Sequence, residues 1–137
     1  MKVRIKMEEL YNIGISEVTI KSMLEINPEL VDISSDEIIE KENILRNIKC
    51  NDTQVRNIIS SNPMFLTRTN SDIIKLLEYL TKLGFNTLNI LFDSNPYILN
   101  FESYEIENYI KRRNSSGDDI QDIIDDLDSN PYLFNEI

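Results

Sequence analysis

The sequence contains no histidine and no tryptophan, and its 137 residues include one cysteine, three glycines and four prolines. Without histidine, the commonest general base and metal ligand is missing. The single thiol, Cys50, has no such base to activate it and cannot form a disulfide within the chain. Glycine occurs only at positions 14, 84 and 117, so no glycine-rich phosphate loop can be formed. We therefore expect a non-catalytic protein without a cofactor or metal, in a reducing compartment such as the cytoplasm.

Long hydrophobic runs are also missing. No apolar stretch approaches the roughly 20 residues that a helix needs to span a bilayer, and the first residues lack the apolar segment of a secretory signal. A length of 137 residues with 41% hydrophobic content suits a single domain with one core. We expect one domain over residues 1–137, with no membrane association.

All four prolines follow an asparagine, and these dipeptides recur at nearly constant spacing. They are Asn27-Pro28, Asn62-Pro63, Asn95-Pro96 and Asn130-Pro131, separated by 35, 33 and 35 residues. A period in the thirties is typical of proteins built from stacked supersecondary units. The spacing therefore predicts a repeat architecture.

Apolar residues recur around each Asn-Pro pair. Three residues before the asparagine stand Leu24, Ile59, Phe92 and Leu127, and three residues after it stand Leu30, Phe65, Ile98 and Leu133. Offsets of three, four and seven place side chains on one stripe of an α-helix. The pattern predicts an all-α fold in which each unit has two helices and a short apolar link, with units at residues 1–13 (partial), 14–48, 49–83, 84–114 and 115–137 (a partial cap).

The Asn-Pro pair itself predicts a helix end. The residue before a proline is forced out of the α region, and asparagine tolerates the left-handed conformation that closes many helices. Proline suits the first position of a new helical turn. That turn would place apolar side chains against the neighbouring helices. The expected N-caps of the longer helices are Ser16, Ser34, Asp52, Asn86 and Ser116.

The pattern that runs from Leu83-Gly84-Phe85 through Asn95-Pro96 to Ile98-Leu99 resembles the repeat of the mitochondrial transcription termination factor (mTERF) family. The resemblance covers about three and a half units. It implies that each repeat has two α-helices and a short 3₁₀ helix, that the repeats stack into a curved right-handed solenoid, and that nucleic acid binds along a positively charged concave path. Lys49-Cys50 departs from the Gly-Phe element of this repeat.

The charge of the chain opposes nucleic-acid binding. It has 24 acidic and 14 basic residues, a net charge of −10, and phosphates are bound mainly by Lys and Arg. The densest basic run is Lys111-Arg112-Arg113, and further cations fall at corresponding helix ends in the preceding repeats. Together they would form a phosphate-contacting rim of Arg46, Lys49, Lys82, Lys111, Arg112 and Arg113. The alternative is that these cations stabilise helix C-termini.

An aspartate-rich stretch at residues 118–128 could suggest a metal site. It lacks the ligand order and the central glycine of an EF-hand. The preferred interpretation is a solvated outer face on a terminal repeat, because end repeats need polar surfaces to stay soluble.

Most aromatic residues fall in or next to the apolar phase and are expected in the core: Phe65, Phe85, Phe92, Phe101, Tyr79, Tyr104 and Tyr109. Tyr97 and Tyr132 differ, because both directly follow an Asn-Pro pair. They could lie at the solvent edge or staple two repeats.

These features leave three functional hypotheses. The preferred one is a non-catalytic scaffold or regulator that binds another protein. The alternative is an mTERF-like nucleic-acid-binding protein, which the resemblance favours and the charge opposes. A second alternative is an acidic decoy for a basic nucleic-acid enzyme. Apolar residues between positions 5 and 13 would also allow an end-to-end homodimer.

Overall fold

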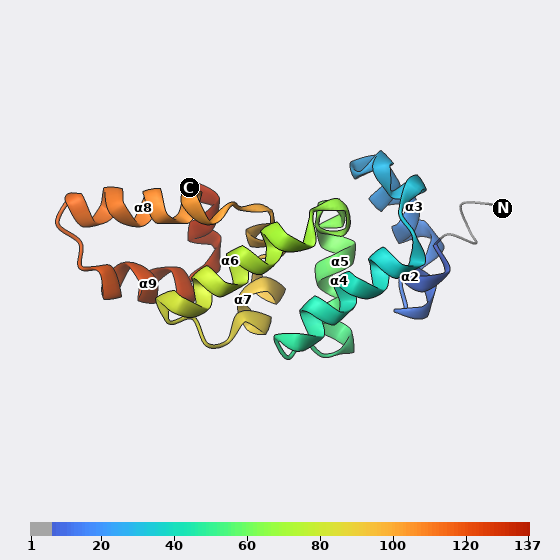
Figure 1. Cartoon of the computed structure of the whole chain (residues 1–137), viewed down its shortest axis with the longest axis horizontal. Helices are drawn as coiled ribbons and strands as arrows, with labels where there is room; N and C mark the ends of the chain where they lie inside the picture. The colour runs from blue at the N-terminus through green and yellow to red at the C-terminus, as the bar shows by residue number, and fades with distance from the viewer. Residues whose placement is uncertain (1–6) are drawn as a thin grey trace. The chain divides into compact units, whose positions relative to one another are not determined.

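The computed structural model describes residues 7–137, and over this range the backbone forms helices and turns with no strand, which confirms the all-α prediction (Figure 1). The chain divides into two compact units, Met1–Arg68 and Thr69–Ile137. The first unit contains α2 (Glu8–Asn12), α3 (Glu17–Ile26), η1 (Pro28–Asp32), α4 (Ser35–Asn47), α5 (Asp52–Ser61) and η2 (Pro63–Thr67). The second contains α6 (Asn70–Leu83), α7 (Leu88–Ser94), η3 (Pro96–Asn100), α8 (Ser103–Ser115), α9 (Ile120–Ser129) and η4 (Pro131–Glu136). Each η element is a short 3₁₀ helix.

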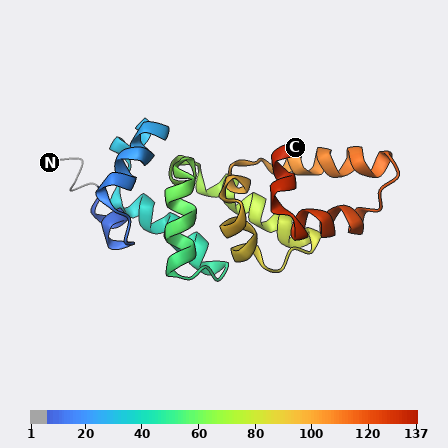
Figure 2. The ribbon, with the colours of Figure 1, turned by 180° about the vertical axis from the view of Figure 1, so that it is seen from behind.

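In the N-terminal unit, α2 packs on α4, α3 packs on α5 and η2, and η2 also contacts α4. The neighbouring helices α4 and α5 are also visible from behind in Figure 2. Met7 and Leu10 are fully buried and Ile13 is half-buried. These three side chains are therefore largely covered within this unit, and the end-to-end dimer stays a prediction. The first six residues of the predicted partial repeat lie outside the described range.

In the C-terminal unit, α8 and α9 lie side by side and run in opposite directions (Figures 1 and 2). Helix α6 contacts α8 and η3, and α7 contacts η3 and η4. Phe134 of η4 is completely buried and lies against two aromatic rings, with its centroid 6.2 Å from that of Phe85 and 6.3 Å from that of Phe101. These rings anchor η4 to the rest of the unit.

Every Asn-Pro pair ends an α-helix and begins a 3₁₀ helix, as the sequence predicts. The asparagine is the C-cap of α3, α5, α7 and α9 in turn, and the proline is the first residue of the following η element. The prediction that these asparagines adopt a left-handed conformation is wrong, because φ is −132° at Asn27 and −144° at Asn95. Proline already excludes the α region for the preceding residue. An asparagine is therefore not needed here for its backbone freedom.

The side chain explains why the residue is asparagine. Asn27 is 2% exposed, and its Nδ2 donates to the carbonyl oxygen of Pro63 at 3.1 Å and to Oγ1 of Thr67 at 2.9 Å. In the second unit, Asn95 is 1% exposed and donates to the carbonyl oxygen of Pro131 at 3.0 Å and to Oδ1 of Asn135 at 3.1 Å. The acceptors lie 36 and 40 residues further along in both cases. The asparagine of one repeat thus binds the Asn-Pro turn of the next repeat.

The expected N-caps are partly confirmed. Ser16 and Ser34 accept hydrogen bonds from the backbone amides of Thr19 and Glu37. Three others are each displaced: the N-caps are Asn51, Thr87 and Asp119 instead of Asp52, Asn86 and Ser116. Asn51 forms a reciprocal capping box with Gln54, which satisfies two backbone donors at once. Ser116 is instead the C-cap of α8, and its backbone amide donates to carbonyl oxygens of that helix.

Lys49 occupies a left-handed backbone position that is otherwise held by glycine. Its φ is +74°, and it is the only non-glycine residue with positive φ in the described part of the chain. Gly84, the C-cap of α6, has φ +111° at the corresponding place in the next repeat. Lys49-Cys50 therefore departs from the repeat pattern in sequence while keeping its backbone geometry.

Glu42 of α4 should make the stability of the protein depend on pH. Its Oε1 is buried and has no hydrogen-bond partner among the described residues. Burial, and secondarily the charge of Glu9, raise the pKa of Glu42 above its ordinary value of 4.5, against a smaller opposing effect of Arg46. Because the folded state holds this proton more tightly, the residue supports folding at low pH and opposes it as pH rises through its folded-state pKa.

We expect Glu42→Gln to stabilise the protein at pH 7, by under about 1 kcal/mol since solvent screens a half-buried group. The gain should shrink as the pH is lowered towards 4.5, because wild-type Glu42 then becomes neutral too. Urea denaturation at several pH values would measure this. The exposed Glu25→Gln substitution on α3 is the control. A gain for Glu42→Gln that did not change with pH would contradict the prediction.

Candidate functional site

The cations of the predicted rim lie at or near the C-terminal ends of α4, α6 and α8. Arg46 lies in the last turn of α4, Lys82 in the last turn of α6, and Arg112 and Arg113 in the last turn of α8. Lys49 follows α4, and Lys111 is on α8 beside Arg112. Arg46 and Lys49 belong to the N-terminal unit, and the other four belong to the C-terminal unit. That all six form one phosphate-binding surface stays a prediction.

Several of these cations already have a carboxylate partner. Arg46 Nη1 lies 2.8 Å from Oδ1 of Asp52, at the start of the next helix. Lys111 Nζ lies 2.8 Å from Oε1 of Glu107, one turn earlier on α8. Both pairs are solvent-exposed and weak. A phosphate could compete for these side chains, but it would have to displace a carboxylate first.

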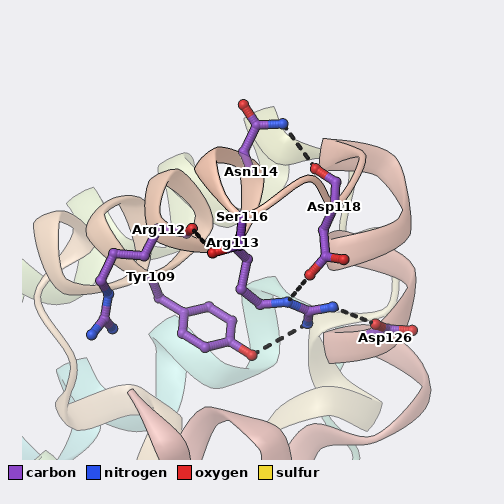
Figure 3. A network of polar contacts seen from close by, with 7 residues as sticks. All are labelled: Tyr109, Arg112, Arg113, Asn114, Ser116, Asp118 and Asp126. Carbon is purple, nitrogen blue, oxygen red and sulfur yellow. Dashed lines mark hydrogen bonds and ion pairs between the residues drawn. The ribbon is translucent and has the colours of Figure 1, made fainter.

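Arg113 is held much more firmly (Figure 3). Its Nε lies 2.8 Å from Oδ2 of Asp118, and its Nη2 lies 2.9 Å from Oδ2 of Asp126 on α9. Nη1 donates to the Tyr109 hydroxyl at 3.3 Å, and the guanidinium carbon lies 5.8 Å from the centroid of the Tyr109 ring. Hydrogen bonds to Asp126, Asp118 and Tyr109, in that order, raise the pKa of Arg113 above its ordinary value. Arg113 therefore fastens the α8–α9 corner rather than facing solvent as a free cation.

We expect Arg113→Ala to loosen this corner. The substitution removes two ion pairs and the hydrogen bond to Tyr109, so the backbone amides of residues 116–120 should exchange hydrogen several-fold faster. Hydrogen–deuterium exchange with mass spectrometry would measure the change. High salt should reduce the difference, because it screens the ion pairs of the wild-type protein.

Arg112→Ala is the matched control for Arg113→Ala. Arg112 is the neighbouring residue, is exposed, and contacts the Tyr109 ring with its guanidinium carbon 6.0 Å from the centroid, but it forms no ion pair within the described chain. Equal exchange in the two variants would show that the Arg113 ion pairs do not hold the corner.

The aspartate-rich stretch has structural roles that the sequence did not reveal. Asp118 and Asp126 bind Arg113, Asp119 caps α9, and Asp125 accepts a hydrogen bond from Gln121. Among residues 7–137, no three His, Cys, Asp or Glu side chains are grouped so that they could hold a metal ion. The stretch thus combines an acidic surface with the contacts that close the α8–α9 corner.

The aromatic predictions are mostly confirmed, with one error. Phe65, Phe85, Phe92 and Tyr109 are buried, Tyr79 and Phe101 are half-buried, and Tyr104 is 61% exposed. It lies in the first turn of α8, outside the stripe of Ile106, Tyr109 and Ile110 that faces the core. Tyr97 and Tyr132 are 54% and 64% exposed, so the alternative of a solvent-edge position is the correct one.

One polar site was missed by sequence reasoning. Arg56 lies on α5 in a hollow beside the turn that precedes α3, in the N-terminal unit. A signal was present in the sequence, because Thr53, Arg56, Asn57 and Ser60 form a polar stripe with helical spacing. Only packing shows that this stripe faces a hollow.

The fold is that of a helical-repeat protein in which a 3₁₀ helix begins at the proline of every Asn-Pro pair. Within residues 7–137, none of the helices combines the length and hydrophobicity that crossing a membrane requires. The mTERF family model matches residues 1–102, which is most of the chain. The protein therefore belongs to the mTERF family. No curated protein and no solved structure matches it.

Proposed function

We propose that this protein is a non-catalytic nucleic-acid-binding module and that its N-terminal unit makes the contacts with phosphate. The observation that carries the proposal is the uneven distribution of charge. Residues 1–68 contain nine basic and eleven acidic residues, a net charge of −2, whereas residues 69–137 contain five and thirteen, a net charge of −8. Most of the charge that opposes nucleic-acid binding therefore belongs to one unit.

Membership of the mTERF family supports this proposal, because it implies nucleic-acid binding by stacked repeats. In each unit, three cations have no carboxylate partner among residues 7–137: Lys21, Lys49 and Arg56 in the N-terminal unit, and Lys75, Lys82 and Arg112 in the C-terminal unit. The units differ in the charge around these cations, because the net charge is −2 in the N-terminal unit and −8 in the C-terminal unit. Cations that are not already neutralised can release counterions from a phosphate backbone.

The test is a binding titration of the full chain against single- and double-stranded DNA and RNA at about 50 mM salt, repeated at rising salt. A triple variant of the N-terminal unit, Lys21→Glu, Lys49→Glu and Arg56→Glu, should lose most of the affinity. The log–log slope of its salt dependence should fall by about 0.9 on duplex DNA, and by about 0.7 on single strands, for each phosphate that the variant no longer neutralises. The matched control, Lys82→Glu, Lys111→Glu and Arg112→Glu, makes the same charge change in the C-terminal unit and should bind nearly as tightly as the wild type.

The two variants also separate the hypotheses. If only the C-terminal variant loses affinity, the predicted rim at the end of α8 is the contact surface and the N-terminal assignment is wrong. If the wild-type chain binds no nucleic acid even at low salt, the proposal fails as a whole.

A protein-interaction scaffold is the second candidate, and the exposed tyrosines favour it. Tyr97 and Tyr132 occupy equivalent positions after successive Asn-Pro pairs, in a unit with a net charge of −8. Exposed tyrosines in an acidic setting would suit a basic protein partner, because tyrosine is enriched at interfaces and opposite charges steer association. Binding of basic peptides that is lost in a Tyr97→Ser, Tyr132→Ser variant would support this candidate. We also propose a cytoplasmic location, because the single cysteine, Cys50, is buried and a chain without an internal disulfide suits a reducing compartment.

A further inference from the structure

A polar hollow of about 310 Å³ lies in the N-terminal unit between the turn at residues 14–16 and one face of α5. Its polar lining consists of Ser16, Thr19, Thr53, Arg56, Asn57 and Ser60. Among the described residues, one cation and no carboxylate line it, although the chain has 24 acidic residues. This composition is the reverse of the average surface of the protein.

Arg56 has no carboxylate or hydrogen-bond acceptor for its guanidinium within the described part of the chain. The side chain is half-buried, and α5 is fixed in place by its opposite face, where Val55, Ile58 and Ile59 are completely buried. Arg46 and Arg113, by contrast, are both bound to aspartates. Arg56 is therefore positioned by the fold while its hydrogen-bond donors remain available.

Gly14 makes room for the guanidinium. A Cβ atom at this position would lie 3.1 Å from Nη1 of Arg56, closer than most such contacts in proteins. The residue also has φ +99°, which side chains other than glycine rarely adopt. The turn before α3 and the Arg56 side chain thus fit each other closely, and the guanidinium lies against the wall of the hollow.

The hydroxyl groups around Arg56 supply further donors. Ser16 Oγ donates to Oγ1 of Thr19, which leaves the Thr19 proton free to donate. Thr53 has no hydrogen-bond partner for its hydroxyl within the described range. Ser60 is different, because its hydroxyl donates to the carbonyl oxygen of Arg56 at 2.7 Å. One guanidinium and two threonine hydroxyls can therefore donate hydrogen bonds to a ligand that carries several acceptors.

Two carboxylates are near the hollow in sequence but do not line it. Glu17 follows Ser16, and Asp52 precedes Thr53. Asp52 is 82% exposed at its side chain and is bound to Arg46, so it is directed to another cation. The part of the wall formed by residues 7–137 thus has a positive charge and no competing carboxylate.

We propose that this hollow binds a single phosphate group, held by the guanidinium of Arg56 and by the hydroxyls of Thr19 and Thr53. A phosphate carries several acceptor oxygens, and a guanidinium matches them with paired donors. The volume is at the small end of ligand sites, so it suits one phosphate with its sugar. The phosphate belongs either to a nucleic-acid backbone or to a free nucleotide. The first source rests on the proposed function, whereas the second does not.

The experiment is a titration of the full-length protein followed by nuclear magnetic resonance, with inorganic phosphate, a nucleoside monophosphate and a short single-stranded oligonucleotide in separate arms. The expected result is saturable shifts of the Arg56 Nε–H and Thr19 amide signals. Arg56→Gln should weaken phosphate binding at least about tenfold, because it removes a charge-assisted hydrogen bond. Lys75→Gln, which removes an exposed cation of the C-terminal unit, should leave the shifts unchanged.

Thr53→Val provides a second variant should Arg56→Gln fail to fold, and it should weaken the same shifts without removing charge. The site would be overturned if the shifts were absent in every arm, or if the Thr19 amide titrated with unchanged affinity in the folded Arg56→Gln or Thr53→Val variant. If phosphate and the mononucleotide bind in the hollow but the oligonucleotide does not, the site stands and the proposed function fails. If the oligonucleotide binds and none of the three ligands shifts Arg56 or Thr19, the proposed function stands and the site is wrong.

Discussion

Phe134→Ala is expected to destabilise the C-terminal unit by about 3–5 kcal/mol, the usual cost of removing a buried phenylalanine. The side chain is completely buried, and its ring lies 6.2 Å from Phe85 and 6.3 Å from Phe101, centroid to centroid. The substitution removes the contacts of the Phe134 ring with these two rings and leaves a cavity between η4 and the rest of the unit. Urea denaturation followed by far-ultraviolet circular dichroism would show a midpoint at much lower urea.

Two substitutions in the same 3₁₀ helix serve as controls. Phe134→Leu retains most of the buried volume and should cost less than half as much. Tyr132→Ala changes a residue that is 64% exposed and should alter the stability by no more than about 0.5 kcal/mol. If Phe134→Ala matched Tyr132→Ala, the ring would not be part of the core.

Asn27→Ala should cost about 1–3 kcal/mol, because it leaves the carbonyl oxygen of Pro63 without its donor in a buried position. Asn27→Asp should cost more at pH 7, although the shape is the same. A carboxylate cannot donate to the Pro63 carbonyl oxygen, and the substitution would also bury a charge. Part of this stability should be recovered at low pH, where the protonated acid can donate again.

The same urea assay measures both Asn27 variants, and Asn43→Ala on the exposed face of α4 is the control. Asn43 lies in the middle of α4, where alanine has the higher helix propensity, so its replacement by alanine should be neutral or slightly stabilising. Equal stabilities for Asn27→Ala and Asn27→Asp at pH 7 would contradict the role of Asn27 as a donor between repeats.

Of the candidate site, the sequence predicted the positions of the cations but not their partners. Arg46, Lys82, Arg112 and Arg113 do lie in the last turns of their helices, as helical periodicity indicated. That Arg113 is bound to Asp118 and Asp126 depends on how α9 folds back along α8. The Arg56 hollow likewise depends on the turn at Gly14 meeting α5, residues that lie 42 positions apart in the chain. Local sequence patterns do not show which residues come into contact when distant segments pack together.

The sequence by itself determined the all-α class and the helix stops, because proline forbids the α region to the residue before it and apolar spacing of three and four residues defines helix faces. It also determined the net charge of −10. Only the tertiary structure decided what the asparagines do and which charges are free. Asn27 reaches Pro63 and Thr67 across one repeat, and Arg56 has no carboxylate partner among the described residues whereas Arg113 has two. Hydrogen bonds and ion pairs act over about 3 Å, so their partners are fixed by which helices pack together.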